Sequence, residues 1–308
     1  ERNGVIKGGD KVSGEDCREG ITAIISVKLT DAQFEGQTKA KLGNAYIRAL
    51  VDQIVSDQLA TYLEEHPQTA KIILEKAMMA NRAREAFPQT PIIIGGIEAS
   101  LRRFAHYDYW DDAVRRSILE DSGADLLSYG MGERSMTALA HGLRQGKPLS
   151  QLHDIRGTCF LAADPGECAF PDPLILPSFE QVRDDKKAYA RAAFLQQNEN
   201  DFARGHALLQ PTGSRWLIQN PPALPLEGRE LDAVFALPYA RYYHPDYEAQ
   251  GGVAAIEEVR FSIIHNRGCF GACNFCALAL HQGRYVSARS IQSVLAEARQ
   301  IIADPDFK

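Results

Sequence analysis

Hydrophobic residues in the first third of the chain follow a strand pattern and then a helical one. Residues 20–29 are β-branched and apolar over the length of a strand, which predicts a strand there. Apolar residues then recur at helical spacing over 44–63 and again over 67–85, which predicts two helices. The helical pattern ends at Phe87-Pro88, because proline interrupts a helix.

The next part of the chain alternates short apolar runs with glycine turns and helical patterns. Residues 92–94 predict a strand, which leads through Gly95-Gly96 into a helix that opens near 98–100. A second predicted strand, 124–128, ends in the turn 130–133, and a helical pattern continues from there through Leu143. Strand, glycine turn and helix in this order are typical of an α/β layer.

Proline divides the remainder of the chain. Residues 157–177 and 211–238 are rich in proline, and we predict that both are irregular, separated by a polar helix over 179–198. Near the end of the chain the pattern predicts a strand over 260–264, a loop over 267–276 and an amphipathic helix over 288–303. These patterns divide the chain into four predicted parts. The first is residues 1–86 and the second is a Rossmann-like α/β domain over 87–160. A proline-rich insertion and linker follows over 161–259, and the last part is 260–308.

The composition is that of a globular protein. The chain has 308 residues, 45% of them hydrophobic, and this length suits about two to three domains. Its formal charge of −6 excludes nonspecific adhesion of the whole chain to DNA or to an anionic membrane. The apolar runs are shorter than the ~18–20 residues that cross a bilayer, so we expect a soluble protein. The chain opens with Glu1 and has no signal-peptide pattern, and we expect a fragment whose start lies upstream.

Three of the six cysteines lie within eight residues, at Cys269, Cys273 and Cys276, in a loop that contains glycine. Three thiolates this close can converge on one centre, and three ligands leave one iron of a 4Fe-4S cube open. An open iron can bind the amino and carboxylate groups of a small cofactor. The other cysteines are scattered at Cys17, Cys159 and Cys168. They form no disulfide framework, and this usage favours a reducing cytosol, hence a cytoplasmic protein.

Two alternatives to the cluster remain open. The first is a zinc site made by the three cysteines with His281 or His265 as the fourth ligand. Structural zinc sites use short C-x2-C pairs, and only Cys273 and Cys276 have that spacing. The second alternative is that the three cysteines are ordinary thiols. The spacing favours the iron–sulfur cluster over both.

Residues 267–276 (RGCFGACNFC) resemble the signature loop of radical S-adenosylmethionine (radical SAM) enzymes, including the aromatic Phe275 before the third cysteine. Residues 91–103, 106–110, 220–222, 234–239 and 244–245 extend the likeness to the YgiQ-type branch of that superfamily, over about 87–308. The resemblance implies that the cysteines hold a 4Fe-4S cluster and that S-adenosylmethionine binds its fourth iron beside Phe275. It also implies that an electron donor drives cleavage of this cofactor to a 5′-deoxyadenosyl radical, which takes hydrogen from an unknown substrate.

The glycine turns at the strand ends allow two interpretations. Gly95-Gly96 and residues 130–133 suit the close approach of a phosphate or cofactor, but tight α/β turns also use glycine regularly. Their pattern resembles the cobalamin-binding-like domain of some radical enzymes. No D-x-H-x-x-G sequence is present to ligate cobalt, so we do not predict cobalamin.

Residues 1–86 point elsewhere. Residues 16–29, 37–39 and 83–86 resemble the transducer domain of the gyrase B subunit, a type IIA DNA topoisomerase. This resemblance implies that Lys39 reaches the γ-phosphate of ATP with Gln37 beside it, and that the partners are DNA and the gyrase A subunit. A lysine ammonium suits a phosphate, although a loop lysine is more often simply solvent-exposed. The two resemblances meet near 85–88, and a chimeric reading frame, an assembly join or a natural fusion would each produce that.

The sequence therefore predicts an α/β protein with a transducer-like segment, a Rossmann-like layer and the first βα unit of a truncated radical SAM barrel. The favoured function is that of a radical SAM iron–sulfur protein whose substrate is unknown. The alternative is a fragment of an ATP-hydrolysing topoisomerase. No catalytic residue can be assigned, and we expect one βα unit to be an incomplete enzyme.

Overall fold

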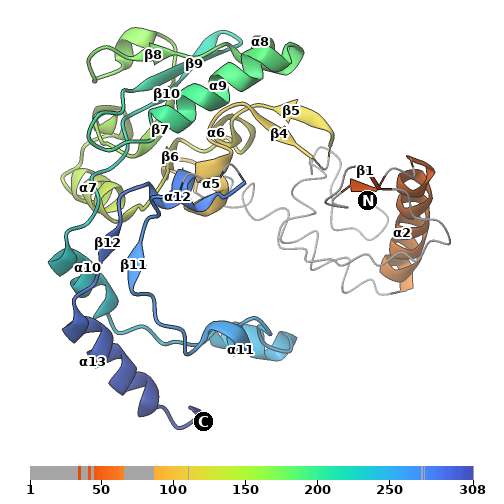
Figure 1. The fold of residues 1–308 in the computed structure, drawn as a ribbon. Helices are drawn as coiled ribbons and strands as arrows, with labels where there is room; N and C mark the ends of the chain where they lie inside the picture. Colours follow the sequence, from red (N-terminus) through yellow and green to blue (C-terminus); the bar gives the residue numbers. More distant parts are fainter. Residues whose placement is uncertain are drawn as a thin grey trace. The chain divides into compact units, whose positions relative to one another are not determined.

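A computed structural model of the chain describes residues 34–35, 41–42, 45–65, 87–109, 111–271, 273 and 275–307. The chain divides into two compact units, residues 1–90 and 91–308. The colours of Figure 1 follow the chain through both units.

The first unit contains a small hairpin and one long helix. The strands β1 (Phe34–Glu35) and β2 (Lys41–Leu42) pair antiparallel, and the helix α2 spans Ala45–Glu65. The helix predicted over 44–63 is thereby confirmed. The strand predicted over 20–29 and the helix predicted over 67–85 lie outside the described residues.

A mixed six-stranded sheet organises the second unit (Figure 1). Its strands, in spatial order, are β3 (Ile93–Ile94), β6 (Leu126–Ser128), β7 (Thr158–Ala162), β10 (Arg215–Gln219), β9 (Leu208–Thr212) and β8 (Leu174–Ile175). The pairs β3–β6 and β8–β9 are parallel and the other three are antiparallel. The α/β class is confirmed, since helices precede and follow these strands along the chain.

The second unit also contains helices, two of which begin at a capping serine. They are α5 (Gly96–Leu101), α6 (Ile118–Asp121), α7 (Glu133–Arg144), α8 (Phe179–Asp184), α9 (Lys186–Asn198), α10 (Gly228–Phe235), α11 (Ile256–Val259), α12 (Leu278–Gln282) and α13 (Ile291–Ile302). Ser178 begins α8 and Ser290 begins α13, each by accepting a hydrogen bond from a backbone amide three residues on. The helices expected after both glycine turns, over 179–198 and over 288–303 are confirmed.

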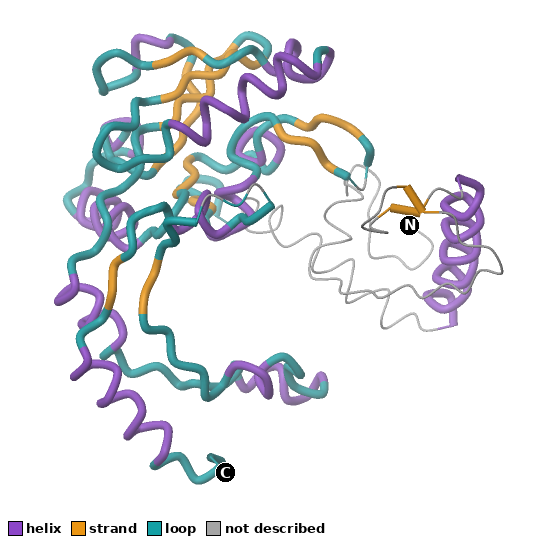
Figure 2. The backbone as a smooth tube through the Cα atoms, in the orientation of Figure 1, coloured by secondary structure: helices purple, strands orange, loops and turns teal. Residues whose placement is uncertain are grey.

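Shorter elements complete the second unit. The strands β4 (His106–Asp108) and β5 (Ala113–Arg115) form one antiparallel ribbon, and β11 (Asn266–Arg267) and β12 (Ser287–Ala288) form another. Short 3₁₀ turns span Leu149–Leu152, Pro165–Glu167 and Pro245–Gln250. Figure 2 shows the strands of the β11–β12 ribbon running side by side, apart from the six-stranded sheet.

The sheet is buried on both faces. On one face Leu127, Cys159 and Leu217 pack with α5 and α6, through Ala99 and Leu119. On the other face the buried side chains include Phe160, Leu209 and Ile218, and Leu126 packs against Leu139 of α7 and Leu152. Burial on both faces explains the continuous apolar runs in these strands, which lack the alternation of a half-exposed strand.

The irregular structure predicted for 157–177 and 211–238 is wrong. These residues contain β7, β8, β10 and α10, and β7 and β10 lie in the middle of the sheet. The prolines surround strands of only two to five residues, so the composition concealed them. Pro211 lies inside β9, beyond the last residue paired with β8, where an edge strand tolerates a proline. The domain boundary expected after residue 160 lies inside β7.

The strand predicted over 260–264 is also wrong. The helix α11 precedes this segment, residues 260–265 are irregular, and the strand β11 that follows has two residues. The β-branched and aromatic pattern of 260–264 satisfies local strand preference, but a strand also needs a partner. Among the described residues, this part of the chain has a pairing partner only at 266–267, where β12 pairs with β11. The loop expected over 267–276 begins where β11 ends.

In the described part of the chain, no helix has the length and apolar character needed to cross a membrane.

The sheet core generates a stability prediction. Phe160 is fully buried, and its ring stacks on that of His153 at a centroid distance of 3.7 Å. Replacing Phe160 with Ala should lower the free energy of unfolding by about 3–5 kcal/mol, because it leaves a cavity on the face of the sheet where Phe160 packs with Leu209 and Ile218. The control is Phe194→Ala on α9, since Phe194 is 63% exposed, and it should change stability by less than ~0.5 kcal/mol. Urea unfolding of both variants checks this, and equal effects would contradict it.

Candidate functional site

The base of the cysteine loop is held by hydrogen bonds and a close backbone approach to the segment 282–285. The backbone N–H of Cys269 donates to the carbonyl of Gly283 at 3.1 Å, and that of Gly268 donates to Oε1 of Gln282 at 2.9 Å. Gly268 has φ +83°, and a Cβ there would lie 1.9 Å from the carbonyl oxygen of Tyr285. Only glycine allows this approach, so the sequence fixes where the loop begins.

The three thiols are free and follow one another around a tight turn. The backbone N–H of Cys276 donates to the carbonyl of Cys273 at 3.2 Å. A Cβ on Gly271 would lie 3.3 Å from Sγ of Cys269 and 3.9 Å from Sγ of Cys273. Both sulfurs therefore lie on the side of Gly271 where a larger residue would carry its side chain. Cys273 is exposed, whereas Cys269 and Cys276 are half-buried.

Neither predicted ligand set is assembled as a finished metal site. Among the residues that the structure describes, no three His, Cys, Asp or Glu side chains stand close enough together to hold an ion. The histidines of the zinc alternative have other contacts, since Nδ1 of His281 lies 2.8 Å from Oγ of Ser100 and Nδ1 of His265 lies 3.2 Å from Oδ1 of Asn266. Phe270 and Phe275 are 86% and 92% exposed, so both aromatic rings of the loop project into solvent.

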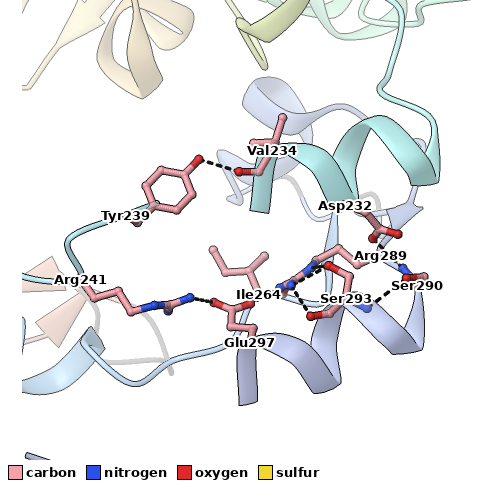
Figure 3. Close-up of polar contacts among 9 residues, drawn as sticks. All are labelled: Asp232, Val234, Tyr239, Arg241, Ile264, Arg289, Ser290, Ser293 and Glu297. Carbon is pink, nitrogen blue, oxygen red and sulfur yellow. Dashed lines mark hydrogen bonds and ion pairs between the residues drawn. The ribbon is translucent and has the colours of Figure 1, made fainter. Parts of the chain in front are cut away.

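A buried arginine holds the segment that leads into the loop (Figure 3). Arg289 is 4% exposed, and its guanidinium donates to the carbonyl of Ile264 at 2.9 Å. Its backbone N–H donates to the carbonyl of His265 at 3.0 Å. The same guanidinium pairs with Glu297 and donates to Oγ of Ser293 at 2.9 Å, both on α13. Arg289 therefore fixes the approach to the cysteine loop against α13.

Glu297 is the shared acceptor of this network. Arg289 donates to one of its carboxylate oxygens and Nη2 of Arg241 donates to the other at 2.8 Å. Burial acts to raise the pKa of Glu297, but the hydrogen bonds from Arg289 and Arg241 outweigh it and the pKa is lowered. Figure 3 also shows Ser290 donating to Asp232 of α10, so three segments meet here.

A second node joins the helix after the cysteines to the α/β layer. Oγ of Ser100 donates to the carbonyl of Gly96 at 2.9 Å and accepts from the backbone N–H of Gly130 at 2.9 Å. A hydroxyl has one hydrogen, so Nδ1 of His281 is the donor to Ser100 and Nε2 is left as an acceptor. Burial lowers the pKa of His281, and the nearby positive charge of Arg103 lowers it further. The ring is thus held as a neutral imidazole.

Both glycine turns predicted from the sequence border this node. Gly130 has φ +72°, and a Cβ there would meet the carbonyl oxygen of His281 at 3.4 Å. Glycine is thus favoured at this turn for two reasons, its positive φ and the close approach of α12. Figure 1 shows α5 and α12 side by side, and their residues are in contact.

Gln37 and Lys39, which the gyrase resemblance links to ATP, lie outside the described residues. Other residues that position the site had no predicted role, namely Arg289 and Glu297, and the predicted loop and glycine turn included Arg267 and Glu133 without their pairing. Each is an ordinary charged residue in its local sequence. Glu133 and Arg267 form an ion pair although they lie 134 positions apart in the chain. The local sequence around either residue does not predict such a pair.

Two family models match the chain. The radical SAM N-terminal model matches residues 63–262, and the DNA gyrase B model matches residues 1–90. The first covers more than half of the chain, and the second is confined to a segment of which little is described.

Related proteins were also found in bacteria. A UPF0313 protein of Clostridium botulinum (strain ATCC 19397 / Type A) is 53% identical over 228 residues, which are 74% of this chain and 35% of that protein. A UPF0313 protein of Clostridium perfringens (strain ATCC 13124) is 50% identical over 228 residues, which are 74% of this chain and 34% of that protein. The chain thus spans about a third of the length of the curated relatives it matches.

Two solved structures show a weak likeness. Both are of the radical S-adenosylmethionine methyltransferase TsrM from Kitasatospora setae. One, with tryptophan substrate and a SAM analogue bound, has a TM-score of 0.36 and 19% identity over 73% of this chain and 31% of that chain. The other, with cobalamin and a [4Fe-4S] cluster bound, has a TM-score of 0.35 and 18% identity over 73% of this chain and 32% of that chain. Scores this low support no inference about this chain.

The Arg289 network generates a prediction. Replacing Arg289 with Met should lower the free energy of unfolding by about 3–5 kcal/mol, because it removes one partner of a buried ion pair. The control is Arg299→Met on the exposed side of α13, which should change stability by less than ~0.5 kcal/mol. Denaturant unfolding measures both, and an unchanged midpoint for Arg289→Met would show that the network does not hold α13.

A second prediction concerns the protonation of His281. Its pKa should lie below the usual 6.5, because burial and Arg103 disfavour the cation. The unfolded chain then binds this proton at higher pH than the folded chain, so this group's contribution to stability is present above pH 6.5 and is lost as the pH falls below it. NMR titration of the ring proton gives the pKa, and His281→Gln identifies the signal. A pKa at or above 6.5 would contradict the assignment.

Proposed function

We propose, from the premise that this chain belongs to the radical SAM N-terminal family, that its cysteine loop holds a 4Fe-4S cluster to which S-adenosylmethionine binds. The single observation that carries the proposal is the loop itself, with three free thiols in eight residues and two sulfurs beside Gly271. The chemistry of these donors fits the group, because thiolates are the usual ligands of iron–sulfur clusters. Cys269, Cys273 and Cys276 are the ligands in this proposal.

A cluster of this kind, when bound, supplies one electron to S-adenosylmethionine. The residues of the chain prepare the place for it. Gly271 leaves open the space that a side chain would fill between two of the sulfurs, and Gly268 ties the loop to the segment 282–285. The exposed ring of Phe275 stands next to Cys276, and we propose that it packs against the bound cofactor.

The rest of the reaction belongs to partners that remain to be identified. An electron donor must reduce the cluster, and Cys273 is the exposed member of the set, so the loop is accessible to one. A reducing compartment keeps such thiols from forming disulfides, and we propose the cytoplasm. The substrate remains unassigned, since the chain covers about a third of its relatives' length.

No specific observation supports the alternative function, that of a topoisomerase fragment. The gyrase B match is limited to residues 1–90, and the residues that would contact ATP lie outside those described. ATP binding is therefore not proposed.

Anaerobic reconstitution tests the cluster directly. Treatment of the chain with iron and sulfide should yield about four irons with acid-labile sulfide and a broad visible absorbance. Replacing Cys273 with Ala should abolish that absorbance, because it removes one of three ligands. The control is Cys168→Ala, a half-buried free thiol outside the loop, which should load normally. One tightly bound zinc without labile sulfide would overturn the proposal.

A further inference from the structure

A cavity of about 420 Å³ lies beneath the base of the cysteine loop. This volume falls within the ~300–1,000 Å³ typical of small-molecule sites. Four segments that are distant in sequence form its walls, namely residues 129–134, 197–204, 222–226 and 281–287. None of the three cysteines lines it, and the cysteine loop contributes only its first residue, Arg267, to the wall.

Polar contacts between the segments hold these walls together. Nδ2 of Asn200 donates to the carbonyl of Ala279 at 2.9 Å, and Oγ of Ser287 donates to the carbonyl of Leu226 at 2.6 Å. The Arg267–Glu133 ion pair closes a third side. A cavity held in this way is preformed, and binding there costs little reorganisation.

The lining is rich in arginine. Arg134, Arg204, Arg267 and Arg284 line the cavity, against the carboxylates of Glu133 and Asp201. Arg267 is paired with Glu133, and Arg134 donates to Glu230 at 2.5 Å. Arg284 is exposed and forms neither a hydrogen bond nor an ion pair with the described residues. A free guanidinium at the cavity suits a phosphate, which it can bind through two parallel hydrogen bonds.

Two polar atoms in the wall are buried without a hydrogen bond to any described residue. Nε of Arg134 and Oε2 of Glu133 are buried, and each lacks a hydrogen-bond partner in the part of the chain that is described. Buried polar atoms are nearly always paired in native proteins, so each calls for an explanation. A ligand with both an acceptor and an N–H donor would satisfy them.

The remaining walls suit a flat ring. Phe202 and Tyr285 form an edge-to-face pair at 5.4 Å, and both line the cavity. The amide side chains of Gln197, Asn198 and Gln282 also line it. Aromatic faces stack on a nucleobase, and amides pair with the donors and acceptors along its edge.

We propose that this cavity binds a mononucleotide, with its phosphate on Arg284 and its base against Phe202 and Tyr285. The assignment goes beyond the cysteine loop and does not depend on a cluster. S-adenosylmethionine also carries an adenine, but its sulfonium is positive and it has no phosphate, so the arginines disfavour it relative to AMP. The proposal therefore separates a nucleotide site from the cofactor site.

Isothermal titration of the full chain with AMP, adenosine, ribose 5-phosphate and S-adenosylmethionine tests the proposal. AMP should bind at one site, at least tenfold tighter than adenosine, which lacks the phosphate, and than ribose 5-phosphate, which lacks the base. Arg284→Gln should weaken AMP at least tenfold and leave adenosine unchanged. Arg183→Gln is the matched control, since Arg183 is an exposed arginine outside the cavity, and it should bind AMP as the parent does.

The outcomes are distinguishable from those of the cluster experiment. Cys273→Ala should bind AMP normally even where it fails to load iron. Arg204 is 89% exposed, so Arg204→Gln provides a second variant that cannot disturb packing, and a loss of AMP affinity in it would support the site. No saturable AMP binding by a chain whose circular dichroism is native would overturn the proposal. Unchanged AMP affinity in Arg284→Gln, or tighter binding of S-adenosylmethionine than of AMP in competition, would do so as well.

Discussion

The contact between Gly268 and the segment 282–285 determines where the cysteine sulfurs lie. The backbones approach so closely that a single methyl group at Gly268 would overlap the carbonyl of Tyr285. Because the chain returns through Gly283 to meet Cys269, the three thiols are carried on a closed loop. Arg289 fixes the segment before this loop, and Ser100 fixes the helix after it through His281. Both ends of the loop are therefore anchored to buried groups.

A buried positive charge, that of Arg103, lies against the end of the strand β10. Arg103 is 2% exposed and donates to Oε1 of Gln219 at 2.5 Å, with its guanidinium 4.9 Å from the centre of the Tyr129 ring. Burial lowers the pKa of Arg103. A buried cation is costly unless it is hydrogen-bonded, so the amide and the ring are needed here. This charge lies behind Tyr129, which forms part of the cavity wall.

The cysteine loop and the cavity share a wall without sharing residues that bind. Gly283 accepts from Cys269 on one side and lines the cavity on the other. The wall of the cavity and the base of the cysteine loop are therefore joined by a backbone hydrogen bond and by the bond from Gly268 to the Gln282 side chain.

The sequence by itself determined the features that depend on neighbours along the chain. The three cysteines, the glycine turns after β3 and β6 and the helices with apolar periodicity all follow from local spacing, since turn conformation and amphipathic faces are set within a few residues. It missed β7, β8 and β10, because these short strands are stabilised by pairing and burial within the sheet and the surrounding prolines mask their pattern. It also misplaced the strand at 260–264, where preference was present but a pairing partner was not. Only the tertiary structure brought Glu133 to Arg267, Ser100 to His281 and Phe202 to Tyr285, because such contacts join segments whose separation in the chain carries no signal.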